Sequence, residues 1–169
     1  MLTRPTSNDI GEFQKKYIAN CPDDIIPFLK EQRNAFAGFI DGLSEEQLMF
    51  RYAPGKWTLR DVIVHIIDTE LVFDYRCLSI LRDDPQALPG FDQDVYMKEK
   101  DFSHLTKVYL KNAFLHIRDY SLILFSGFQA SDWLKKGEIS NYEMGLNAMP
   151  YMLGGHLQHH LNVIKERYI

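Results

Sequence analysis

Apolar residues recur at helical spacing along most of this chain. In residues 59–82 they include Leu59, Val62, Ile66, Phe73 and Ile80, separated by three, four or seven positions. Such a series lies along one face of an α-helix. Residues 25–42, 103–127 and 140–167 are expected to form three further long helices, and no segment shows a credible strand pattern. The sequence therefore predicts an all-α protein with four long amphipathic helices.

Capping residues indicate where these helices begin. Asp24 is expected to cap the first and Thr58 the second, while Gly42 and the Asp83-Asp84-Pro85 sequence end them. Capping boxes at Ser44 and Ser140 predict a short helical turn and the start of the fourth long helix, and Ser103 is expected to open the third. Pro150 would then lie inside the fourth helix, where it predicts a kink that costs about 3 kcal/mol.

The connection over residues 83–103 has no sustained period. A linker of this length is uncommon in a compact domain unless it has a function or crosses the fold. We therefore expect a four-helix bundle with one long crossover between helices 2 and 3, which also helps to cover a site. Residues 1–22 read as an irregular N-terminal arm that folds over the body of a single domain, residues 1–169.

Composition excludes several classes of protein. The chain has 169 residues and a net charge of -4, which argues against a nucleic-acid partner because such proteins present basic surfaces. No segment is apolar enough to cross a membrane, and the N-terminus lacks a secretory pattern, so a cytoplasmic protein is expected. Cys21 and Cys77 are far apart and are expected to be free thiols.

Three of the six histidines lie in the segment GGHLQHHLNVIKERY, residues 154–168. Residues four apart on a helix differ by ~40° and lie one turn apart, so His156 and His160 present their imidazoles to the same point. His159 is offset from His156 by ~60° and could be a substitute ligand, a supporting residue or a surface residue. Two imidazoles on adjacent turns supply half of a site for zinc, nickel, copper or iron.

His65 is the best candidate for a third ligand. It lies among β-branched and apolar residues in the second long helix, where a buried imidazole needs partners for both ring nitrogens. A metal ion on one nitrogen and an acceptor on the other would satisfy it, and Asp68 is either that acceptor or a residue at the solvent edge. A lone histidine is more often a hydrogen-bonded core residue, but its combination with the HxxxH pattern favours a metal site.

These residues resemble a known family. The segments Gly55-Lys56-Trp57-Thr58-Leu59-Arg60-Asp61-Val62 and Gly155-His156-Leu157-Gln158-His159-His160, with His65 between them, are similar to the DinB/YfiT-like superfamily of four-helix-bundle metalloenzymes. The resemblance implies a divalent ion, zinc or nickel, on His65, His156 and His160. It also implies either hydrolysis of a small molecule or transfer of a low-molecular-weight thiol, such as bacillithiol or mycothiol, to an electrophile.

Arg76 is expected on the same helix face as His65. It follows His65 by eleven residues, which places it within ~20° and about 16 Å further along the helix. Its guanidinium could hold a carboxylate or thiolate substrate, or it could pair with Asp92 or Asp94 to fix the crossover.

The reaction type is less well determined by the sequence. Glu70 is turned ~140° from His65, so no carboxylate base is expected beside the metal, which favours thiol transfer slightly over hydrolysis. Trp57, Phe91 and Tyr96 are candidates for the pocket wall. A metal-braced binding module without catalytic activity is the alternative, and a homodimer is plausible.

Overall fold

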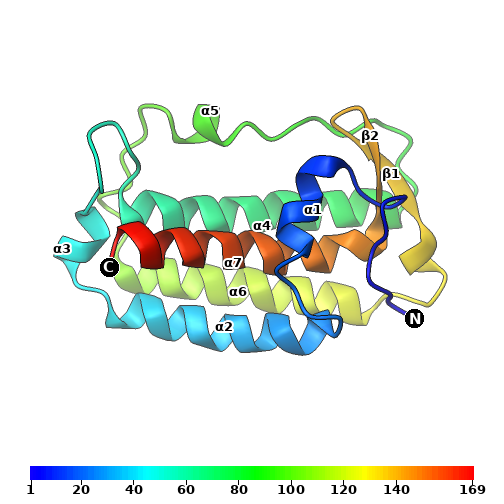
Figure 1. Cartoon of the computed structure of the whole chain (residues 1–169), viewed down its shortest axis with the longest axis horizontal. Coiled ribbons are helices and arrows are strands. Elements are labelled where there is room, and N and C mark those ends of the chain that lie inside the picture. The colour runs from blue at the N-terminus through cyan, green and yellow to red at the C-terminus, as the bar shows by residue number, and fades with distance from the viewer.

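Four long helices form a bundle, as predicted (Figure 1). The computed structural model describes residues 1–169, and the bundle helices are α2 (Ile25–Gly42), α4 (Leu59–Leu81), α6 (Lys107–Ser126) and α7 (Met149–Arg167). Both α2 and α4 pack against α6 and α7, so α2 and α4 occupy opposite corners of the bundle. No helix combines the length and the apolar character needed to span a membrane.

The long crossover follows from the directions of the helices. Figure 1 shows α4 and α6 running in the same direction, opposite to α2 and α7. Because α4 has 23 residues, its end lies about 33 Å from its start, and the chain must return over that length before α6 can begin. The segment between them does so and contains one short helix, α5 (Gln93–Met97).

Two of the five expected caps are present and three differ, among them Ser140, which lies in a turn between two strands. Thr58 forms a capping box with Asp61 at the start of α4, and Ser44 does the same for the short α3 (Glu45–Met49). The third long helix is capped by Thr106, not Ser103, because the Thr106 hydroxyl accepts from the amide of Tyr109. Asp24 occupies the N-cap position of α2, but its side chain makes no capping hydrogen bond.

A β-hairpin contradicts the expectation that the chain has no strands. Strands β1 (Lys136–Ile139) and β2 (Tyr142–Gly145) pair antiparallel, and a short 3-10 turn, Asp132–Leu134, precedes them. Ser140 and Asn141 have φ values of 53° and 67°, the left-handed conformation that a two-residue hairpin turn requires. The predicted capping box at Ser140 is therefore wrong: these residues form a turn, not a helix start.

Pro150 does not kink α7. The hairpin and a second 3-10 turn, Leu146–Ala148, delay the start of the last helix to Met149, so the proline falls in its first turn. Amide groups in that turn have no helical acceptor, and proline is tolerated there. The prediction of a kink was wrong because it started the helix too early.

The N-terminal arm is not wholly irregular, since it contains helix α1 (Glu12–Ile18), which packs on α7. Gly155 permits this contact: a Cβ atom there would lie 2.3 Å from the Tyr17 carbonyl oxygen. On the other side, a Cβ on Gly154 would lie 3.1 Å from Ile25 of α2. The two glycines before His156 therefore let backbone and side chains approach α7 closely from two directions.

A polar layer separates two apolar clusters in the bundle. One cluster includes Phe73, Cys77 and Met152, and the other includes Phe36, Ile63 and Leu157. The polar layer consists of the buried Arg118, Glu70, Ser121 and Asp74. The Arg118 guanidinium contacts the Glu70 carboxylate at 2.5 and 2.9 Å. Cys21 and Cys77 are buried free thiols, as expected.

Candidate metal centre

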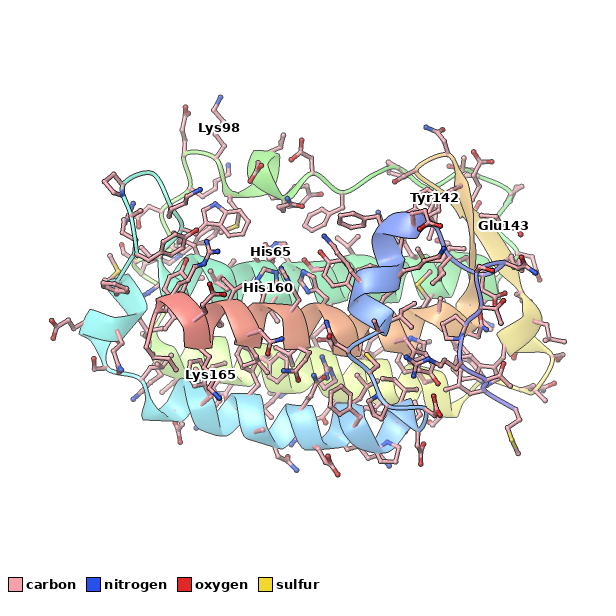
Figure 2. The ribbon with its side chains drawn as sticks, viewed as in Figure 1. His65, Lys98, Tyr142, Glu143, His160 and Lys165 are labelled. Atoms are coloured by element: carbon pink, nitrogen blue, oxygen red, sulfur yellow. The ribbon has the colours of Figure 1, made fainter.

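The imidazoles of His65, His156 and His160 converge on one point. His156 Nε2 lies 3.1 Å from His65 Nε2 and 3.1 Å from His160 Nε2. One nitrogen from each of the three rings falls within 4.8 Å of the other two. Figure 2 shows His65 of α4 and His160 of α7 side by side in the middle of the molecule. Two helices far apart in sequence thus bring together the three residues that the sequence singled out.

Burial keeps these three rings neutral at pH 7. It lowers the pKa of His65 to about 4 and that of His160 to about 3, with smaller contributions from neighbouring imidazoles. The pKa of His156 is also well below its usual value, again mainly because of burial. A neutral imidazole has one nitrogen with a free lone pair, which is the form that binds a metal ion.

The second nitrogen of His65 faces Thr69, not Asp68. Thr69 Oγ1 lies 3.4 Å from His65 Nδ1, one helical turn along α4. A proton on Nδ1 can be donated to this hydroxyl, which leaves the Nε2 lone pair directed at the other two histidines. Asp68 is half-buried, and burial raises its pKa, but it forms no hydrogen bond with His65. The sequence left two roles open for Asp68, and the structure excludes the first, that of hydrogen-bond acceptor for His65.

A pocket of about 390 Å³ opens beside the three imidazoles. Trp57 and Phe91 belong to its wall, as the sequence suggested, and their rings lie 5.1 and 6.3 Å from the His65 ring. Tyr96 is not part of the wall and instead packs on Phe91, with ring centroids 4.7 Å apart. The crossover thus supplies one side of the pocket.

The sequence analysis missed the residues of α1 and the hairpin that close the pocket. They are Phe13, Gln14 and Tyr17 from α1, and Ser140, Tyr142 and Met144 from the hairpin. Two signals were present: the Gly154-Gly155 pair indicates close approach of another segment, and the Ser140-Asn141 pair between alternating residues is compatible with a hairpin turn.

Arg76 lines the same pocket, as its helical position predicted. Its side chain is only 7% exposed, and its Nη2 donates to the carbonyl oxygen of Pro89 at 3.0 Å. It forms no ion pair with Asp92 or Asp94, contrary to one of the two interpretations, because Asp92 instead caps α5. Arg76 holds the crossover through a backbone carbonyl and keeps its charge without a carboxylate partner.

The remaining histidines lie outside the group of three. His159 lines the pocket, half-buried, with its ring 5.5 Å from that of Tyr17. His104 is exposed, and the exposed His116 contacts the carbonyl oxygen of Asn112 at 2.6 Å. Only His159 is therefore near enough to influence the centre.

No aspartate or glutamate contributes to the pocket wall. Glu70 follows His65 by five residues on α4 but does not line the pocket. Its carboxylate instead accepts hydrogen bonds from Arg118, in agreement with the ~140° offset between Glu70 and His65 around the helix. The pocket therefore combines three convergent imidazoles, a fourth imidazole and a guanidinium, with no carboxylate.

Comparisons with known proteins agree with this architecture. The solved structure of YfiT from Bacillus subtilis, described as "a probable metal-dependent hydrolase with an unusual four-helix bundle topology", aligns with a TM-score of 0.73 at 18% identity. The alignment covers 96% of this chain and 89% of that one, and at this identity it shows a shared fold.

Two curated relatives match part of the chain. A "putative metal-dependent hydrolase" of Oceanobacillus iheyensis is 29% identical over 82 residues, 47% of either chain. Another of that description, from Geobacillus thermodenitrificans, is 28% identical over 99 residues, 57% of this chain and 56% of that one. The chain thus spans about half the length of the curated relatives it matches. The family model described as the DinB superfamily matches residues 29–164, which include all three convergent histidines, and the protein therefore belongs to the DinB superfamily.

Proposed function

We propose that His65, His156 and His160 hold a divalent metal ion, zinc or nickel, and that the protein is a metal-dependent enzyme acting on a small molecule in the adjoining pocket. The observation that carries this proposal is the convergence of three Nε2 atoms, with 3.1 Å between His156 and each of the other two. The two curated relatives both carry the name "putative metal-dependent hydrolase", which supports metal-dependent chemistry.

Hydrogen bonds alone account poorly for this cluster. In a neutral imidazole, Nε2 either donates one proton or accepts through one lone pair. His156 Nε2 therefore cannot form a normal hydrogen bond with His65 Nε2 and another with His160 Nε2 at the same time. A single cation accepts all three lone pairs at once. With metal–nitrogen bonds of ~2.0–2.1 Å in tetrahedral geometry, neighbouring nitrogens are about 3.3 Å apart, close to the observed separation.

The number of protein ligands favours an enzyme over a metal-braced binding module. Structural zinc sites generally use four protein ligands, whereas catalytic sites use three and leave a position open. The present group has three histidines and borders a pocket. A fourth ligand from the chain would have favoured the structural alternative.

The chemistry available depends on the other residues of the pocket. A divalent ion on three neutral imidazoles retains its charge and can acidify a bound water or thiol. Water attack benefits from a carboxylate base, and the wall contains none. A thiol ionises far more readily than water: its proton passes to solvent, and its sulfur then bonds to the electrophile as a leaving group departs. We therefore favour transfer of a low-molecular-weight thiol, with hydrolysis as the second candidate because the relatives are named hydrolases.

Metal analysis tests the centre directly. Protein purified without a histidine tag is expected to contain about one zinc or nickel ion per chain, and His65→Ala and His160→Ala should each lose nearly all of it. His159→Ala is the matched control, since it removes a neighbouring imidazole outside the group and should retain the metal. Undiminished metal in both ligand variants would refute the proposed site.

A second experiment separates the two reactions. Metal-loaded protein is given either a thiol with 1-chloro-2,4-dinitrobenzene, where a carbon–sulfur bond forms as chloride leaves, or 4-nitrophenyl acetate with water. Thiol transfer predicts metal-dependent acceleration of the first reaction only, and acceleration of the second alone would favour hydrolysis. If the metal-bound protein accelerates neither, the non-catalytic alternative gains support.

A further inference from the structure

The three buried arginines differ in how their charges are compensated. Arg118 makes two contacts with the Glu70 carboxylate, and Arg60 binds the Glu45 carboxylate and backbone carbonyl groups. Arg76 is also buried, although less completely, and its only hydrogen bond is to the Pro89 carbonyl oxygen. It is also the only arginine in the pocket wall, which contains no lysine and no acidic residue.

No carboxylate neutralises Arg76, and its unbonded guanidinium nitrogens are not among the buried side-chain atoms without a partner, so they are accessible from the pocket. A guanidinium has five N–H donors, and Arg76 uses one of them for Pro89. The others remain available on a side chain that borders the pocket. The missing counter-charge can therefore come from a molecule bound in that pocket.

Tyr142 offers a second donor near Arg76. In the orientation of Gln14 that the structure shows, its amide nitrogen donates to the Tyr142 hydroxyl oxygen and its own Oε1 has no partner, so the hydroxyl hydrogen is left for a molecule in the pocket. All three residues line the pocket, and Figure 2 shows Tyr142 on the hairpin beside α1. Guanidinium and hydroxyl donors in the wall of one pocket form a suitable environment for an anion.

We propose that Arg76 and Tyr142 form a subsite for the carboxylate of an elongated substrate whose reactive end lies at the three histidines. The planar guanidinium matches a carboxylate, and one positive charge balances one negative charge. A phosphate monoester carries nearly two charges at pH 7, and the wall has no second cation to match it. The assignment of the reactive end rests on the proposed function.

The pocket also limits the shape of this substrate. His65 and Arg76 are eleven residues apart on α4, about 16 Å between their Cα atoms along the helix axis, and the arginine side chain leans back toward His65. Phe73 of α4 and Met152 of α7 belong to the wall as well. The substrate class is therefore a carboxylic acid with an apolar middle and a thiol or electrophilic group several bonds from the carboxylate.

The subsite can be tested without metal. Ligand-detected NMR titrations of metal-free protein would measure Kd for hexanoate and for hexan-1-ol. Arg76→Gln is expected to weaken hexanoate binding about tenfold or more, the effect of losing a charged hydrogen bond, and to leave hexanol binding unchanged. Arg82→Gln, which removes an exposed charge just beyond the same helix, is the control and should change neither. Equal hexanoate affinity in wild type and Arg76→Gln would overturn the proposal.

A second variant covers the case in which Arg76→Gln does not fold. Tyr142→Phe removes only the hydroxyl group and should weaken hexanoate binding but not hexanol binding. Similar losses for both ligands would indicate a change in pocket shape and would count against an anion subsite.

A metal-loaded experiment distinguishes failure of this inference from failure of the proposed function. Cobalt-loaded protein is titrated with 6-mercaptohexanoate and 6-mercaptohexan-1-ol, and thiolate binding is followed by cobalt–thiolate absorption. Wild type should prefer the acid about tenfold, and Arg76→Gln should lose this preference while retaining cobalt. If cobalt binds without any preference, the subsite is refuted alone. If cobalt does not bind, the metal centre fails, and the hexanoate titration still decides the subsite.

Discussion

We predict that the buried Asp74 makes the stability of this protein dependent on pH. Its carboxyl is buried in the polar layer, and Oδ1 has no hydrogen-bond partner. Burial is the main cause that raises its pKa from the ordinary 3.8 to about 7, with a further contribution from the Glu70 charge. Ser121 Oγ lies 3.0 Å from both carboxylates, and its single hydrogen can serve only one of them. A proton on Asp74 resolves this shortage of donors.

The sign of the effect follows from proton binding. Between pH 4 and pH 7 the folded protein keeps the Asp74 proton while the unfolded chain has lost it. The contribution of Asp74 to stability is therefore complete below about pH 4, falls as pH rises, and is lost above about pH 7. At about 1.4 kcal/mol per pH unit, the free energy of unfolding should decrease by about 3 kcal/mol between pH 5 and pH 8 through this residue.

Asp74→Asn isolates the effect, because an amide resembles the protonated carboxyl and does not titrate. Urea unfolding of metal-free protein at several pH values would give the free energies of wild type and variant. The free energy of unfolding of the variant, minus that of wild type, should increase by about 3 kcal/mol between pH 5 and pH 8. The variant is compared with wild type at each pH, because the buried histidines affect both proteins equally. Their lowered pKa values make the free energy of unfolding rise with pH over part of the same range.

Asp94→Asn serves as the control, because Asp94 is exposed and its side chain makes no hydrogen bond or ion pair. The difference in free energy of unfolding between Asp94→Asn and wild type should be the same at every pH from 5 to 8. A difference between Asp74→Asn and wild type that also stays constant from pH 5 to pH 8 would refute the reasoning.

Three further changes test the fold around the site by thermal or urea unfolding. Arg118→Met leaves the Glu70 carboxylate buried without its partner and should cost about 3–5 kcal/mol; a cost below about 1 kcal/mol would show that the pair is dispensable. Gly155→Ala places a methyl group against the Tyr17 carbonyl and should cost about 1–3 kcal/mol despite alanine's better helix propensity. Stabilisation by Gly155→Ala would mean that α1 does not pack as described. Asn141→Val should cost about 1–2 kcal/mol because φ at this position is 67°, whereas Asn141→Gly should be tolerated; equal effects would argue against the hairpin turn.

The sequence predicted most of the bundle because helical spacing is a local property. The stripe from Leu59 to Ile80 and the expected cap at Thr58 predicted the limits of α4 almost to the residue. The same local reading failed between residues 136 and 150. Ser140 with Glu143 fits both a capping box and a hairpin, and the pairing of β1 with β2 and with Leu88 decides between them.

The sequence by itself determined which residues form the candidate centre. Spacing on a regular helix places His156 and His160 on one face and Arg76 on the face of His65, wherever the helices pack. Tertiary structure decided the rest: that α4 and α7 are neighbours, that α1 and the hairpin close the pocket, and that Arg76 meets a carbonyl instead of a carboxylate. Contacts between segments distant in sequence depend on how whole helices pack, and no local pattern contains that information.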